Sequence, residues 1–95
     1  MTETIAEAVA AIARKVPSFT AGVAKFVVPG VGSIVIDANG PREGDGPADV
    51  TLTASADVFR GILSGTVNPA SAFMSGKLAV DGSLGMAMKL GSELG

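Results

Sequence analysis

The side chains that could carry acid–base, nucleophilic or metal chemistry in this chain are nine carboxylates, seven cations and the serines. Histidine, cysteine, tyrosine and tryptophan are all absent. Serine–histidine and cysteine–histidine pairs are therefore impossible, which leaves a serine with a lysine or a pair of carboxylates. The carboxylates lie at helix starts, at strand or loop edges, in a turn or near the chain end, where capping and solvation explain them: Glu3, Glu7, Asp37, Glu43, Asp45, Asp49, Asp57, Asp81 and Glu93.

The sequence contains no Asp-x-Asp pair, the spacing that is typical of sites for hard metal ions. The glycines of residues 39–47, NGPREGDGP, do not have the spacing of a phosphate-binding loop, and no lysine–serine pair follows them. We interpret this segment as a surface loop, which could also hold a short edge strand. The sequence thus predicts no catalytic residue, no metal and no cofactor, and the protein is not expected to be an enzyme.

A second group of side chains is apolar and adaptable in shape. It comprises three methionines and four large hydrophobic residues: Met74, Met86, Met88, Phe59, Phe73, Ile62 and Leu63. Methionine is favoured on surfaces that accept more than one apolar partner, but it also fills ordinary cores. By residue type alone, a well-packed core and a pocket for an apolar ligand both remain open.

The elements that would position this group lie in the last part of the chain. Asn68 followed by Pro69 is a helix-start signal, and Gly76 closes the short helix. Residues 77–81, KLAVD, alternate as a half-buried strand does. Ser83 can then cap a final helix.

The final helix is apolar over about 200° of its surface, whereas a stripe of about 100° suffices to dock a helix on one core. We therefore expect this helix to face something apolar on a second side. We assign the side of Leu84 to the scaffold and that of Met86 to a ligand. The apolar residues of the arc are Leu84, Met86, Ala87, Met88, Leu90 and Leu94.

The N-terminal segment predicts an amphipathic helix. Thr4 and Glu7 form a capping box, and Pro17 stops the pattern after the basic pair Arg14-Lys15. The apolar residues recur at helical spacing and favour packing on the core over contact with a membrane: Ile5, Val9, Ile12 and Val16.

Between these ends, residues 25–28 and 33–37 predict a β-hairpin, and residues 50–54 predict a third strand. Two short helices, 55–64 and 68–75, follow, and we expect this crossover to let the last strand pair away from its predecessor. The pattern predicts an α+β fold, with a mixed or antiparallel sheet of four to five strands and helices on one face. At 95 residues, the whole chain 1–95 is expected to form a single small domain.

The segment FMSGKLAVDGSLGMAMKL, which begins at Phe73, resembles the C-terminal signature of the sterol carrier protein 2 family. The resemblance extends backwards through residues 48–53, 57–59 and 63–69 in the order and at about the spacing of that family. It implies a small α/β domain that holds a lipid in an apolar tunnel against the last helix. The family's ligand classes are sterols, fatty acids and acyl-coenzyme A thioesters, and nothing in these residues selects one of them.

Composition limits the partners further. The net charge of −2, with basic residues scattered along the chain, provides no basic stripe for nucleic acid. No apolar run approaches the roughly 18 residues of a spanning helix, so we expect no stable membrane insertion. The acidic start lacks a signal-peptide pattern and the chain ends without a peroxisomal tripeptide, which favours a cytoplasmic protein.

Two hypotheses for function follow. The first is a non-catalytic lipid carrier whose tunnel is lined by Phe59, Ile62, Leu63, Phe73, Met74, Met86, Met88 and Leu90. In that hypothesis Lys77 or Lys89 could hold a carboxylate head at the mouth. The second is an interaction module, in which the wide apolar face of the last helix binds a partner or forms a homodimer.

Overall fold

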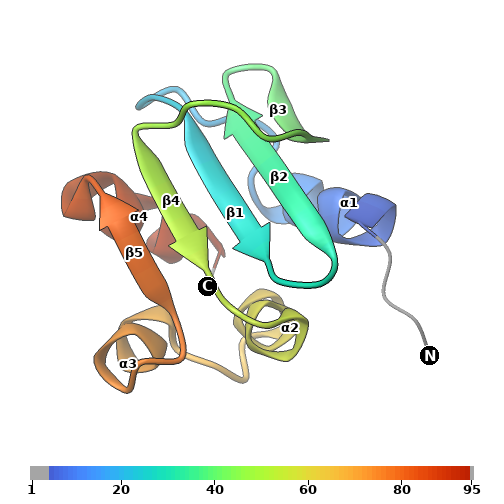
Figure 1. Ribbon diagram of the computed structural model, residues 1–95. Coiled ribbons are helices and arrows are strands. Elements are labelled where there is room, and N and C mark those ends of the chain that lie inside the picture. The colour runs from blue at the N-terminus through green and yellow to red at the C-terminus, as the bar shows by residue number, and fades with distance from the viewer. Residues whose placement is uncertain (1–4, 95) are drawn as a thin grey trace.

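In a computed structural model that describes residues 5–94, five strands form one mixed sheet in the order β3-β2-β1-β4-β5 (Figure 1). Strands β1 and β4 at its centre are parallel, and every other neighbouring pair is antiparallel. The strands are β1 (Ala24–Val28), β2 (Gly32–Asp37), β3 (Gly40–Glu43), β4 (Val50–Thr53) and β5 (Ala79–Gly82). The expected α+β fold with a mixed sheet is confirmed, and the sheet has five strands.

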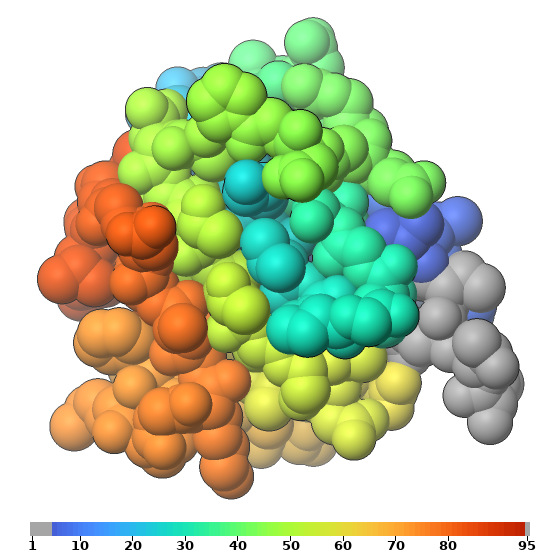
Figure 2. Space-filling view, viewed as in Figure 1, coloured from blue at the N-terminus to red at the C-terminus, as the bar shows by residue number. Residues whose placement is uncertain are grey.

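Four helices pack on one side of this sheet, behind it and around its lower end in Figure 1. They are α1 (Ile5–Lys15), α2 (Ala56–Ser64), α3 (Pro69–Met74) and α4 (Leu84–Leu94). The inward side chains of the central strands form the core with α1, α2 and α4: Ala24, Phe26, Val28, Ile34, Ile36, Val50 and Leu52 are all buried. Figure 2 looks onto the other face, where side chains of β1, β2 and β4 are not covered by helices.

The caps expected from the sequence are present. The Ser55 hydroxyl accepts a hydrogen bond from the Val58 N–H at 3.3 Å, and Gly65 ends α2 in the left-handed conformation (φ 85°). The Asn68 side chain accepts from the Ser71 N–H at 3.1 Å, with proline at the first position of α3. Thr4 of the expected capping box lies outside the described residues. These local signals fix where the helices begin and end.

Two features of the sheet differ from expectation or were left open. The last strand does not pair away from its predecessor: β5 lies antiparallel beside β4, with Leu52 opposite Val80. The two short helices return the chain beside the strand that it left, so this connection crosses no other strand. Within the glycine-rich loop, Gly40–Glu43 forms the edge strand β3, whose register places Arg42 opposite Val35.

The orientation expected for α4 is wrong. Leu84, whose side we assigned to the scaffold, is 54% exposed, and Met88 on the same side is 75% exposed, whereas Met86, on the side assigned to the ligand, is half-buried. The Met86 methyl carbon lies 2.6 Å from where a Cβ on Gly22 would stand, so the missing side chain of Gly22 makes room for it. Leu90 is fully buried on the same side. The helix therefore docks through Met86 and Leu90 and turns Leu84 and Met88 outwards.

Asp49 holds the start of α4 in this orientation. The Val23 N–H donates to its carboxylate at 2.9 Å, and its backbone carbonyl accepts from the Ser83 N–H at 3.1 Å. The Ser83 hydroxyl in turn accepts from the Met86 N–H at 3.3 Å and caps the helix. Glycine is needed at position 82 of this junction, because its φ is 102° and a Cβ there would collide with the Asp49 carbonyl oxygen. The acid interpreted as a solvated strand edge is thus a structural tie between β1, β4 and α4.

Candidate functional site

A cavity of about 590 Å³, here called the larger cavity, lies between the β4–β5 edge of the sheet and helices α2, α3 and α4. Its floor consists of side chains that are all buried: Leu52, Phe59, Ile62, Leu78, Ala87 and Leu94. Its size falls within the roughly 300–1,000 Å³ that is typical of small-molecule sites. Such a floor removes an apolar ligand from water without offering it a polar partner.

The mouth of this cavity is mainly apolar, although the exposed Asn68 and Ser92 also belong to the lining. Four large side chains line it and remain partly in solvent: Phe73 (44% exposed) and Met74 (84%) from α3, and Leu84 (54%) and Met88 (75%) from α4. Gly91 lets the two helices approach closely, since a Cβ there would lie 3.3 Å from the Pro69 Cβ. Apolar groups held at an opening mark a place where an apolar molecule enters or a partner binds.

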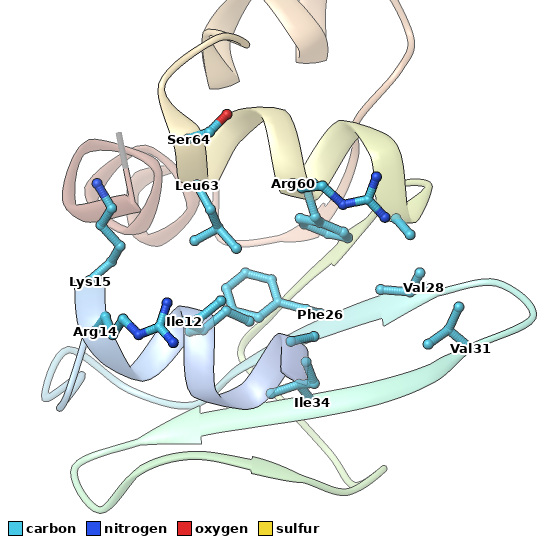
Figure 3. A pocket seen from close by; sticks show the side chains of 14 residues that line it. Ile12, Arg14, Lys15, Phe26, Val28, Val31, Ile34, Arg60, Leu63 and Ser64 are labelled. Atoms are coloured by element: carbon cyan, nitrogen blue, oxygen red, sulfur yellow. The ribbon is translucent and has the colours of Figure 1, made fainter. Parts of the chain in front are cut away.

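A smaller cavity of about 280 Å³ lies between α1 and α2 over strands β1 and β2 (Figure 3). Figure 3 shows Phe26, Val28 and Ile34 on the strand side and Leu63 reaching down from α2. Three cations line this space: Arg14 and Lys15 from the last turn of α1, and Arg60 from α2. Arg60 is paired with Asp57 at 3.0 Å. The two cavities therefore differ in charge as well as in size.

The eight side chains expected to line a tunnel are brought only partly together. Five of them line the larger cavity: Phe59, Ile62, Phe73, Met74 and Met88. Leu63 lines the smaller cavity, and Phe59 lines both. As far as the described residues go, Met86 and Leu90 belong to neither lining, because they face the docked side of α4.

Other lining residues were missed by the sequence reasoning. Leu78, which directly precedes β5, and Val80 within it line the larger cavity, and their alternation was the available signal. Leu84 was assigned to the scaffold although it lines the mouth. Lys77 and Lys89, considered for a carboxylate head, line neither cavity within the described chain, whereas the cations beside the smaller one were not considered.

Proton chemistry has no group to act through in the larger cavity, because none of the described residues that line it is acidic or basic. At the opposite sheet edge, the Arg42 guanidinium donates to Asp37 at 2.9 Å and lowers the pKa of that carboxyl. Both side chains of this pair reach solvent, as in an ordinary surface ion pair. Residues 5–94 contain no cluster of three or more potential metal ligands.

Comparisons with known proteins point to one family. The model of the SCP-2 sterol transfer family matches residues 3–94. Sterol carrier protein 2 of Homo sapiens is 46% identical over 46 residues, which are 48% of this chain and 8% of that protein. Peroxisomal multifunctional enzyme A of Dictyostelium discoideum is 43% identical over 63 residues, which are 66% of this chain and 13% of that enzyme. The matched segment is thus a small part of each of these longer relatives.

One of the solved structures that resemble nearly the whole chain was solved with a fatty acid. It is the solution structure of sterol carrier protein 2 from Aedes aegypti in complex with palmitate, and it superposes with a TM-score of 0.78 at 25% identity. The similarity covers 99% of this chain and 96% of that one. The arrangement of four helices on a five-stranded sheet is therefore shared with a protein whose structure was solved with a fatty acid.

Proposed function

This chain belongs to the SCP-2 sterol transfer family, and from that premise we propose that it binds the apolar part of a lipid in the larger cavity and releases it unchanged. The observation that carries the proposal is a buried apolar floor beneath a mouth that is itself apolar and exposed. A floor of this kind holds a ligand by area removed from water, worth about 25 cal/mol per Å² before association costs. The exposed mouth gives the ligand a route in and out.

The proposed ligands are fatty acids, fatty acyl-coenzyme A thioesters and sterol-like molecules. The buried floor is aliphatic and aromatic, and the polar residues of the lining, Asn68 and Ser92, are exposed at the rim, which favours a ligand held mainly by its hydrocarbon. The palmitate complex of the Aedes aegypti protein supports the fatty acid within that range. The proposed site residues are Phe59, Ile62, Phe73, Met74 and Met88, joined by Leu78, Leu84 and Ala87.

We also propose that the domain is not catalytic. The chain lacks histidine and cysteine, and no acid, base or thiol of the described chain lines the larger cavity.

Among the described residues, no helix has both the length and the apolar character needed to cross a membrane. The second hypothesis, an interaction module built on α4, gains no support from the relatives, and part of the face that it needs lines the cavity. A cytoplasmic location stays a prediction.

Competitive titration against a fluorescent fatty acid tests this proposal. Palmitate, cholesterol and palmitoyl-coenzyme A are added in turn to delipidated protein, and free coenzyme A serves as the control without an apolar part. We expect at least one of the three lipids to displace the fluorescent ligand and free coenzyme A to leave it bound. The palmitoyl thioester should be recovered intact after binding. The proposal would be contradicted if none of the three lipids displaced the fluorescent fatty acid, or if coenzyme A were released from its palmitoyl thioester faster than in buffer.

A further inference from the structure

Building on the proposed lipid site, we propose that the ring of Phe59 is a movable partition between the two cavities and sets the ligand chain length at which both are used. Phe59 lines the larger and the smaller cavity at once, and its side chain is 9% exposed. An acyl chain that extends beyond the larger cavity must displace this ring to continue beneath α2. Phe59 is then a specificity-determining residue for long single chains.

The geometry of α2 places this ring between the two spaces. At about 100° per residue, Ile62 projects roughly 60° to one side of Phe59 and Leu63 roughly 40° to the other. Ile62 lines only the larger cavity, and Leu63 lines only the smaller one, as the described residues place them. Phe59 thus projects from the middle of the helix face that separates the two spaces, and its ring is the side chain that both share.

One described aromatic contact holds the ring in its present position. The ring of Phe26, on β1, meets that of Phe59 edge to face with centroids 5.5 Å apart and planes at 68°. Phe26 is buried and lines the smaller cavity, as Figure 3 shows. An aromatic pair of this kind is worth roughly two- to tenfold in an equilibrium constant. A ligand that moves Phe59 must offset about that much.

The two cavity volumes suggest that displacement of the Phe59 ring increases affinity only for long acyl chains. The smaller cavity, at about 280 Å³, lies just below the range for independent small-molecule sites, whereas the larger, at about 590 Å³, lies well inside it. Each methylene that enters apolar surroundings strengthens binding roughly fourfold. A short chain fits entirely within the larger cavity. A longer chain offsets the lost contact between the rings of Phe26 and Phe59 once one or two of its methylenes enter the smaller cavity.

Dissociation constants for saturated fatty acids from octanoate to stearate test the proposal. In the wild-type protein we expect affinity to rise with each added methylene, to pause where the chain reaches the ring, and then to rise again. Phe59→Leu should remove the pause and strengthen stearate binding relative to octanoate binding roughly two- to tenfold. Phe59→Trp should extend the pause to the end of the series. Phe73→Leu, a matched change at the mouth of the larger cavity alone, should keep the pause in place.

A measurement on unaltered protein keeps the proposal testable if the Phe59 variants do not fold. Nuclear Overhauser contacts from the terminal methyl of bound octanoate should reach Ile62 and not Leu63, whereas those of bound stearate should reach Leu63. Three results would overturn the partition without affecting the proposed lipid site. They are a rise in affinity without any pause, a pause that Phe59→Leu does not move, and bound stearate that never contacts Leu63. Failure of every fatty acid to bind would instead overturn the lipid site itself.

Discussion

Leu90→Asp is expected to abolish the folded state, whereas Leu84→Asp, on the same helix, is expected to keep the fold and to weaken lipid binding at least tenfold. Leu90 is 0% exposed and packs in the core, so its replacement buries a carboxylate with no partner. That burial costs several kcal/mol, comparable with the roughly 5–15 kcal/mol that stabilises a domain. Leu84 is half in solvent at the cavity mouth, where the new charge stays hydrated.

Circular dichroism and a fatty-acid titration separate the two effects. Loss of the Leu84 side chain removes apolar contact worth about 1.5 kcal/mol or more, hence the tenfold loss of affinity. Ala21→Asp, at an exposed position outside both cavities, is the control for the added charge and should change neither property. A folded Leu90→Asp protein together with an unfolded Leu84→Asp protein would restore the orientation of α4 that we expected from the sequence.

Saturating lipid is expected to raise the melting temperature of delipidated protein by about ten degrees or more. A ligand at about 100 times its dissociation constant that binds only the folded state adds about 2.7 kcal/mol. In a chain of 95 residues, each kcal/mol shifts the melting temperature by roughly 4–8 °C. Thermal unfolding followed by circular dichroism, with palmitate, cholesterol and palmitoyl-coenzyme A tested separately, measures this shift.

The same experiment has a built-in comparison. Leu84→Asp protein, which is expected to fold but to bind lipid poorly, should melt near the delipidated wild type and respond little to palmitate. Delipidated protein that melts at high temperature and is unmoved by all three lipids would mean that the larger cavity closes in solution. That result would favour the hypothesis that the domain is an interaction module.

Local signals in the sequence predicted the elements well because the residues that cause them are neighbours. Ser55, Asn68 and Ser83 cap the helices that follow them through bonds to residues three positions ahead. The hairpin of β1 and β2 follows from two β-branched runs around a glycine-rich turn. Such features need no knowledge of the rest of the chain.

What could not be predicted depends on contacts between distant residues. The side of α4 that docks is decided by the space above Gly22, which precedes Met86 by 64 residues, and by Asp49, which precedes Ser83 by 34. Both sides of that helix are apolar, so its periodicity alone could not choose between them. The pairing of β5 with β4 likewise depends on how the two intervening helices fold back.

The candidate site was predicted where helix faces are unambiguous and missed where they are not. Phe59 and Ile62 lie on one clear apolar face of α2, and both line the larger cavity. Met86 and Leu90 were included because the Met86 side of α4 was assigned to the ligand, whereas that side docks on the rest of the fold. The cations of the smaller cavity come from α1 and α2, which only the tertiary structure brings together.

A crystal structure of the protein with palmitate tests the central claim most directly. We predict that the hydrocarbon chain lies between α3, α4 and the β4–β5 edge, in contact with Leu78, Ala87 and Leu94, and that it leaves through the mouth beside Met88. Palmitate found only on the outer surface, with Phe73, Met74 and Leu84 packed into the space that the larger cavity occupies here, would contradict the account.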